Sequence, residues 1–515
     1  MSSIRSWTRP LAVLGLAALT LPGAALGQAA PTGTLTIGSA QDGVSMDPQM
    51  YRHAHSETLQ VNMRNRLWIS IPPIGELIPQ LAESISQVDD THYDVKLRQG
   101  VHFHNGEEMT ADDVVYTFKR LWDPDNKSPR ANMGNMANIE NIEAVDRYTV
   151  RWTTKVPFGP PEEAIRGLHV GGQEILPKSV YENMPLEEAA KGSVVGAGPF
   201  QFVEWIPDQR LVMKAFPDYF GGAPGVETVI WKVVPEESTR VAELLAGSVD
   251  LIMNITPDSV EQLKTAGMKL EVVPSQHSRF LQMNVREGSP FADLEVRKAM
   301  NMGIDRKGIT EALYKDLAVP FNQMAGVAQE GYIEGYDPFP FNPEAARAVL
   351  SKVTQPIQLI TAGENELFAE AIAEQLRGYG MNVTTSIQDG AAVEQASDAG
   401  TFDLMIFGSS YGGGMFLTGF YNNHFECARM ATGKQIRTGY CNEELDAIVT
   451  AARAEVDPVK RNAASQEVAK KLMEEGAPWV NLFGPAQVWA MQPYVNGFVG
   501  GAGGLMDISK VTLDK

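Results

Sequence analysis

The feature that most limits the fold is a succession of three segments between residues 356 and 388. "PIQLITAG" is an apolar, β-branched run ending in glycine, and "MNVTTSIQ" is also rich in β-branched residues, so both segments predict strands. The stretch between them, "ENELFAEAIAEQLRGYG", has the apolar spacing of a helix and is closed by glycine. A strand, a helix and a strand in this order form a βαβ unit. We therefore predict an α/β fold.

A further apolar segment, "TFDLMIFG", also predicts a strand and runs directly into "SSYGGG". The residues from Gly408 to Gly412 fit the G-x-S-x-G pattern of a hydrolase nucleophile, but this site needs an acid and then a histidine after Ser410. The only later histidine is His424, and no acid lies between the two. No Lys or Arg occurs between residues 404 and 428, which also argues against a phosphate-binding loop. Two interpretations stay open for this segment, a ligand-lining loop and a plain mobile loop.

The N-terminus predicts export. Arg5 and Arg9 precede the apolar run "LAVLGLAALTL", and small residues follow it, which is the order of a secretory signal peptide. We place the cleavage after Gly27, with cleavage after Ala30 as the alternative. No later run reaches the ~18 apolar residues of a membrane span. The mature chain is therefore expected to be periplasmic, and its 488 residues after Gly27 are too many for one core.

Composition restricts the partners. The full chain has a net charge of −20, and loss of Arg5 and Arg9 makes it −22. This acidity argues against binding to nucleic acid or to anionic membranes. No enzyme constellation is found, so we expect no catalytic residues, no cofactor and no metal.

The two cysteines, Cys427 and Cys441, are close in sequence and predict a disulfide in an oxidising compartment. Metal binding with His424 is the rival interpretation. His102 and His104 alternate on a strand beside a turn, and we expect them to have structural roles. Thr110 and Asn342 are predicted helix caps.

Three longer segments together resemble the family 5 extracellular solute-binding proteins of ABC transporters, the dipeptide, oligopeptide and nickel-binding group. They are "IPQLAESISQVDDTHYDVKLRQGVHFHNGEEMTADDVVYTFKRL", the block from "VGAGPFQF" through "DYFGGAPGVETV" to "AGSVDLI", and "LQMNVREGSPFADLEVRKAMNMGIDRKGI". Their order and spacing hold across essentially the whole mature chain.

The resemblance implies a two-lobed, type II-like periplasmic binding protein that closes about a hinge, with an extra domain inserted in the first lobe. The expected divisions are a signal peptide over 1–27, a first lobe over 28–275 that includes an inserted subdomain at about 60–180, a second lobe over 276–487, and a return to the first lobe over 488–515. Cys427 and Cys441 fall where similar proteins carry a disulfide in the second lobe.

The resemblance also implies ligand contacts from three stretches, namely "MDPQMYRHAHSETLQ", the interlobe strand "SRFLQMN" and "GSSYGGG". The residues that they offer are Tyr51, Arg52, His53, His55, Arg279, Gln282, Asn284, Ser409, Ser410 and Tyr411.

One departure bears on the ligand. Peptide binders of this group carry an aspartate in the loop after the Phe-Asp strand, whereas residues 404–425 hold no acid and Asp403 belongs to the strand itself. Arg52 and Arg279, with Arg64 or Arg66 as further candidates, would instead face an anionic or hydroxyl-rich ligand.

We therefore expect a monomeric periplasmic receptor that passes a small peptide-like, opine-like or other polar solute to an ABC permease. An oligosaccharide or metal-chelate binder and a periplasmic chaperone or sensor are the alternatives.

Overall fold

The computed structural model describes residues 30–51, 54–70, 77–131, 139–158, 161, 164–165, 173–192, 194–274, 277–315, 317–325, 330–410, 417–430, 438–455, 457–476, 478–501 and 504–515. The predicted signal peptide lies outside this part of the chain. None of the described helices is long and apolar enough to cross a membrane.

A 12-stranded sheet runs through the molecule in the order β16-β15-β17-β13-β18-β11-β1-β10-β9-β8, with β12 and β14 also paired to β18. Its strands are β1 (Thr34–Ser39), β8 (Phe200–Ile206), β9 (Arg210–Ala215), β10 (Thr228–Val233), β11 (Leu251–Met253), β12 (Lys269–Pro274), β13 (His277–Met283), β14 (Ala318–Pro320), β15 (Pro356–Ala362), β16 (Asn382–Gln388), β17 (Leu404–Ser410) and β18 (Trp479–Met491).

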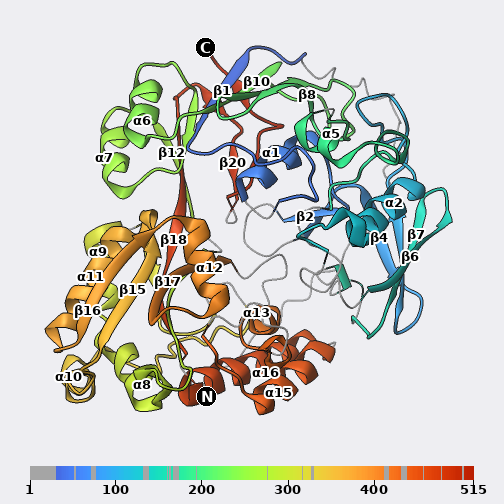
Figure 1. The fold of residues 1–515 in the computed structure, drawn as a ribbon. Helices are drawn as coiled ribbons and strands as arrows, with labels where there is room; N and C mark the ends of the chain where they lie inside the picture. Colours follow the sequence, from blue (N-terminus) through green and yellow to red (C-terminus); the bar gives the residue numbers. More distant parts are fainter. Residues whose placement is uncertain are drawn as a thin grey trace, which may run out of the picture.

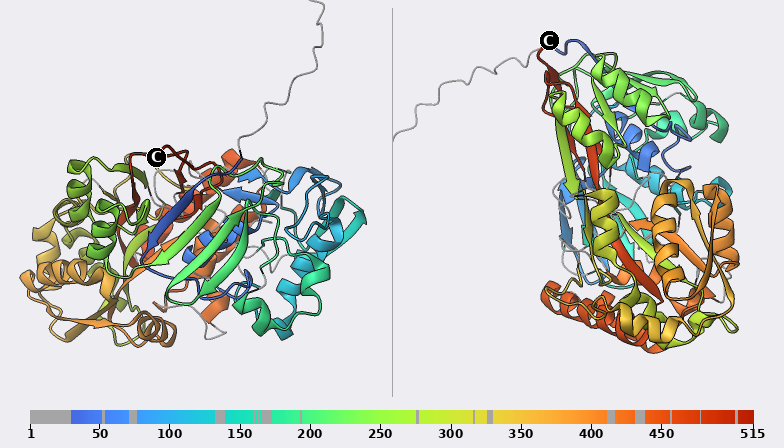
Figure 2. Two further views of the ribbon diagram at one scale, coloured as in Figure 1. Left: turned by 90° about the horizontal axis from the view of Figure 1, so that it is seen from above. Right: turned by 90° about the vertical axis from the view of Figure 1, so that its left-hand side faces the viewer.

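Strand β18 joins the two halves of this sheet. Its C-terminal part pairs with β11 and β12, and its N-terminal part pairs with β13 and β14. Figures 1 and 2 show it running from the half that holds β1 and β10 to the half that holds β15 and β17.

The predicted βαβ unit is confirmed. Strands β15 and β16 pair in parallel, from Pro356 opposite Asn382 to Ala362 opposite Gln388. Helix α11 (Glu366–Gly378) connects them. Strand β17 is also parallel to β15, so the carboxyl ends of β15 and β17 lie at the same edge of the sheet.

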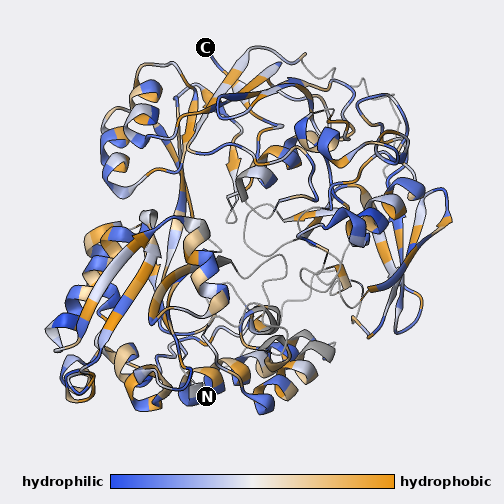
Figure 3. Ribbon diagram, in the orientation of Figure 1, coloured by the Kyte–Doolittle hydropathy of each residue, from blue (hydrophilic) through white to orange (hydrophobic). Residues whose placement is uncertain are grey.

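Helices cover both faces of this half. Alternate strand residues point to opposite sides, so one strand packs against both layers of helices. Leu281 and Met283 of β13 pack in one apolar cluster with residues of α8 to α11. Phe280 of the same strand packs in another with residues of α13, α15 and α16. Figure 3 shows strands banded with apolar residues, and helices around them that carry both apolar and polar residues. The helices are α8 (Leu294–Gly303), α9 (Arg306–Tyr314), α10 (Pro343–Leu350), α12 (Gly390–Ala399), α13 (Leu417–His424), α14 (Cys427–Met430), α15 (Glu443–Ala454) and α16 (Pro458–Lys471).

A separate four-stranded sheet, in the order β4-β5-β7-β6, lies within the range predicted for the inserted subdomain. Phe118 and Trp122 of its helix pack edge-on against Trp152 of the sheet. The predicted cap at the helix start is present, because the Asp113 carboxylate accepts a hydrogen bond of 2.8 Å from the Thr110 backbone N–H. The elements are β4 (Ala82–Gln87), β5 (His92–Leu97), α2 (Ala111–Trp122), β6 (Ile139–Asp146) and β7 (Thr149–Thr154).

The end of the chain returns to the half that holds β1. Val495, Met506 and Val511 pack in one apolar cluster with Leu35 and Ile37 of β1. The remaining elements are α1 (Ala54–Met63), β2 (Trp68–Ser70), β3 (Leu77–Pro79), α4 (Lys178–Tyr181), α5 (Leu186–Lys191), α6 (Glu237–Leu245), α7 (Pro257–Thr265), β19 (Val495–Asn496), β20 (Val499–Gly500), β21 (Met506–Asp507), β22 (Thr512–Leu513), the 3₁₀ turns η1 (Pro124–Asn126), η3 (Pro290–Ala292) and η4 (Gly363–Asn365), and the π-helical turn η6 (Leu472–Gly476).

Candidate functional site

Two of the three predicted contact stretches lie side by side. Strands β13 and β17 are antiparallel neighbours, and their register places Ser278 opposite Ser409 and Arg279 opposite Gly408. Ser409 and Ser410 are therefore the last residues of β17, at the edge where β15 also ends. The side chains of both serines, and Tyr411 as a whole, lie outside the described part of the structure.

Arg279 is the predicted contact whose geometry is best defined. Its Nε donates a hydrogen bond of 3.1 Å to Oδ1 of Asn365, which starts helix α11. A Cβ atom on Gly408 would lie 2.2 Å from Nη1 of Arg279, so the guanidinium passes directly over this glycine. The Arg279 side chain is half-buried. Within the described part of the chain, its two terminal nitrogens have no hydrogen bond or ion pair.

Gln282 and Asn284 differ in how their amides are used. Asn284 donates to the carbonyl oxygens of Gly400 and Phe402 at 3.1 and 2.8 Å, which fixes the turn before β17. Gln282 is completely buried, and neither its Oε1 nor its Nε2 has a hydrogen-bond partner among the described residues. Leaving such a group unpaired costs about 1–3 kcal/mol.

The first contact stretch, which includes the start of α1, packs against the other half of the large sheet. Tyr51 is buried, and its hydroxyl has no hydrogen-bond partner in the described part of the chain. The Arg130 guanidinium lies 4.8 Å from the centre of its ring. Burial, and then the negative charge of Glu174, raise the pKa of Tyr51 well above its ordinary value. Arg52 and His53 lie outside the described residues. His55 is in α1, and its side chain is not described.

A buried charge cluster surrounds Tyr51, and the sequence reasoning did not find it. Arg66 donates from Nε to Glu174 at 3.0 Å and from Nη2 to Glu57 at 2.7 Å. Burial alone would lower the pKa of Arg66, but the carboxylates of Glu174 and Glu57 raise it above its ordinary value. Glu174 is 108 residues from Arg66, so no local pattern pairs them.

Arg64 and Arg66, which the sequence offers as arginines facing a ligand, are both buried and engaged with protein groups. Arg64 donates to the carbonyl oxygen of Met46 and to the hydroxyl of Tyr181. These bonds give both arginines structural roles. Among the candidate arginines whose side chains the structure describes, Arg279 is the one with both terminal nitrogens unpaired.

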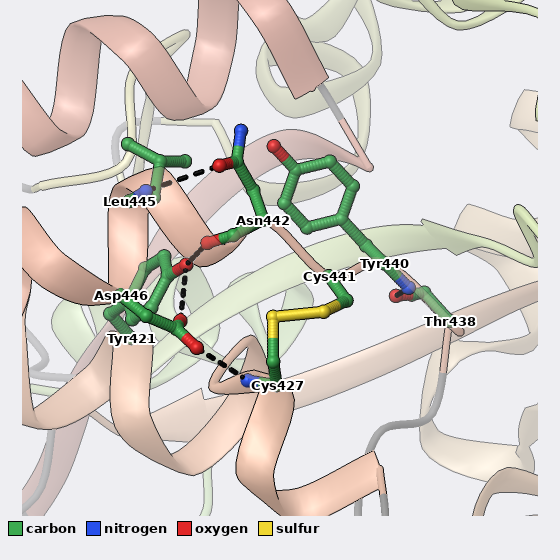
Figure 4. The surroundings of a disulfide bond; sticks show 8 residues. All are labelled: Tyr421, Cys427, Thr438, Tyr440, Cys441, Asn442, Leu445 and Asp446. Carbon is green, nitrogen blue, oxygen red and sulfur yellow. Dashed lines mark hydrogen bonds between the residues drawn. A yellow bond between two sulfur atoms is a disulfide. The ribbon is translucent and has the colours of Figure 1, made fainter.

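The predicted disulfide between Cys427 and Cys441 is confirmed (Figure 4). The bond uses both thiols, so the alternative of a cysteine metal site is wrong. No group of three His, Cys, Asp or Glu residues in the described ranges is arranged to hold a metal ion. Asp446 of α15 accepts hydrogen bonds of 2.9 Å from the Cys427 backbone N–H and from the Tyr421 hydroxyl, which ties α13 and α14 to α15.

His104 has the structural role expected of it. One ring nitrogen lies 3.0 Å from the carbonyl oxygen of Gly198, and the other lies 3.3 Å from the backbone nitrogen of Gly196. Burial lowers the pKa of His104 to about 4.

Comparison with known proteins adds a family and a fold. The family model for "Bacterial extracellular solute-binding proteins, family 5 Middle" matches residues 76–430. The chain is 26% identical to di/tripeptide-binding protein 2 of Pseudomonas aeruginosa, over 98% of this chain and 100% of that protein.

Two solved structures have a similar fold. The periplasmic binding protein DppA of Helicobacter pylori, in complex with the peptide STSA, superposes with a TM-score of 0.81 at 24% identity, covering 94% of this chain and 99% of DppA. The binding protein MoaA of A. tumefacien R10, in complex with mannopinic acid, gives 0.80 at 21% identity, covering 94% and 100%. The two-lobed periplasmic-binding-protein fold is thereby confirmed.

Proposed function

The chain belongs to the family 5 bacterial extracellular solute-binding proteins, and we propose that its solute is a small polar molecule with a carboxylate group. The substrate-binding role in ABC import follows from the family, which consists of transport proteins and not of enzymes. The finer points belong to the proposal: the mature protein is a non-catalytic periplasmic monomer, released after Gly27, that delivers its solute to an inner-membrane permease. The lobe boundaries predicted from the sequence are part of it as well.

The observation that carries the choice of solute is the end of the Arg279 side chain, whose two terminal nitrogens have no partner among the residues that the structure describes. An arginine whose terminal nitrogens lack partners can bind a carboxylate through two parallel hydrogen bonds. Arg279 is on β13, next to the carboxyl ends of β17 and β15, the edge at which open α/β sheets bind ligands. The peptide and the mannopinic acid bound by DppA and MoaA both carry carboxylates, which agrees with this choice.

Closure of the lobes would contribute the rest of the affinity. A hinge at the strand that both halves share would bring Tyr51 and Arg279 to opposite sides of one solute and remove it from water. The Tyr51 hydroxyl is buried and has no hydrogen-bond partner among the described residues, so a hydroxyl or amide group of the solute could pair with it only if the solute reached into this cluster.

The test is isothermal titration of the protein and its Arg279→Met variant with mannopinic acid, glutathione and the dipeptide Ala-Leu. Loss of a charge-assisted bond of ~1.5–3 kcal/mol predicts ~10- to 100-fold weaker binding. Arg210→Met is the matched control, because Arg210 pairs with Glu204 on the surface of β9. Equal affinities of the Arg279→Met variant and the protein would contradict the proposal. Binding of uncharged oligosaccharides alone would favour the alternative ligand class.

A further inference from the structure

The surroundings of Arg279 contain two residues whose local chemistry is unusual for their positions. Asn365 is the N-cap residue of α11, yet its side chain makes no capping hydrogen bond. Its Oδ1 accepts instead from Nε of Arg279 at 3.1 Å. Asn365 is also the last residue of the 3₁₀ turn η4, which continues into α11, so its side chain does not cap the helix and is available to Arg279.

Gly408 is unusual because it needs no special backbone angle. It is not among the residues with a positive φ, so another residue could adopt its conformation. Space is what requires a glycine here, since a Cβ would lie 2.2 Å from Nη1 and 3.0 Å from Cζ of Arg279. Any side chain on this residue would displace the guanidinium.

Together the two residues fix how Arg279 can be used. A guanidinium can meet a carboxylate along the edge formed by Nε and one terminal nitrogen, or end-on through both terminal nitrogens. The single N–H of Nε is already donated to Oδ1 of Asn365. Asn365 is 6% exposed, so packing around it holds its side chain in place. Only the end-on edge is left for an anion.

We propose that Asn365 and Gly408 are positioning residues that hold Arg279 for end-on, two-bond recognition of a single carboxylate. This inference rests on the proposed function. It adds a specificity: a solute with a free carboxylate is selected over the same solute with that group converted to an amide, because an amide offers one acceptor oxygen where the carboxylate offers two.

The test measures selectivity and not affinity alone. Dissociation constants of Ala-Leu, glutathione and mannopinic acid, and of their carboxamides, are determined by titration for the protein and for Asn365→Ala, Gly408→Ala and Arg279→Met. For solutes that bind, we expect Asn365→Ala and Gly408→Ala each to weaken the acid ~3- to 10-fold and to leave the amide nearly unchanged, since one oriented hydrogen bond is worth ~1 kcal/mol.

Two controls separate positioning from a general effect on the fold. Gly363→Ala is the matched glycine control. Gly363 directly follows β15, close to Asn365, and a Cβ at this residue meets nothing within 4 Å. In the Arg279→Met background, Asn365→Ala should have no further effect on selectivity, whereas a purely structural role would lower both affinities again.

The outcomes distinguish the two proposals. If Arg279→Met weakens acid binding but Asn365→Ala and Gly408→Ala weaken acid and amide equally, or neither, the positioning role is wrong and the proposed function stands. If Arg279→Met has no effect, or none of the three acids binds, the proposed function is wrong and the positioning role falls with it.

Discussion

At the scale of single residues, the Arg66–Glu174 pair has the largest consequence for stability. Both side chains are at most 2% exposed, so water cannot replace either partner. We expect Glu174→Gln to lower the free energy of unfolding by at most ~3–5 kcal/mol, because the buried charge of Arg66 then keeps only the carboxylate of Glu57 as its partner. Urea unfolding followed by tryptophan fluorescence measures this. Glu187→Gln, which breaks the exposed pair with Lys191, should leave the midpoint unchanged. A similar midpoint for both variants would contradict a role for the buried cluster.

His104 gives the protein a pH-dependent stability. Its pKa of about 4 in the folded protein is below the ordinary value of 6.5. The unfolded chain therefore takes up a proton as the pH falls through 6.5, while the folded protein does so only near pH 4. The contribution of His104 is fully present above pH 6.5 and is lost between there and pH 4.

We expect His104→Gln to reduce the fall in unfolding free energy between pH 7 and pH 5, measured by urea titration at both pH values. His102→Gln, at an exposed position two residues away, is the control and should keep the full fall. An unchanged pH slope in His104→Gln would mean that other groups produce it.

The residue scale is also where sequence reasoning was least complete. The sequence offered Arg64 and Arg66 as arginines that could face a ligand, and the structure shows both in buried networks. Their partners Tyr181 and Glu174 lie 117 and 108 residues away. No periodicity or motif could indicate those pairs, because only the folded chain brings them together. Arg279 could be singled out from the sequence, but its partners Asn365 and Gly408 could not.

At the scale of elements, local patterns predicted the units whose parts are close in sequence. The alternation of strand and helix over residues 356–388 gave the βαβ unit, and Asn342 caps α10 as expected, accepting from the Ala345 N–H at 3.0 Å. Strand β18 was not predicted. It is buried at both ends, so it lacks the alternation that marks a half-exposed strand, and its partners β11 to β13 begin more than 190 residues before it.

The Cys427–Cys441 bond stabilises the connection between α14 and α15. It closes a loop with a sequence separation of 14. A loop of this size predicts a loss of ~3 kcal/mol in unfolding free energy when both cysteines are replaced by serine, mainly because the unfolded chain gains freedom. Urea unfolding of the double variant, and of the unaltered protein with and without dithiothreitol, measures the loss. Equal midpoints under oxidising and reducing conditions would show that α15 is held by its other contacts, such as the Asp446 hydrogen bonds.

At the scale of the whole molecule, one strand connects two halves that each contribute part of the candidate site. Arg279 is on β13, and β13 pairs with β18 close to the point where β18 passes into the other half. The Tyr51 cluster belongs to that other half. A solute that contacts both would hold the halves together, which is how binding energy is converted into lobe closure.

The overall fold could be predicted in outline, since export, size and the three family-like segments agreed with an exported two-lobed receptor. The solute could not be predicted in the same way. Of the expected contacts, Arg279 lies outside the family-like segments, and several others lie outside the described part of the structure. The described residues bear most directly on the charge of the solute, because Arg279 is a cation that would favour an anionic group.

The most direct test of the central claim is therefore thermal unfolding of the protein with matched pairs of acids and amides: Ala-Leu, glutathione and mannopinic acid, each beside its carboxamide. A bound solute at ~100 times its Kd adds ~2.7 kcal/mol and should raise Tm by a few degrees. The account predicts a rise with at least one acid and a much smaller rise with its amide. Equal rises with acid and amide, or a rise only with uncharged oligosaccharides, would contradict recognition of a carboxylate.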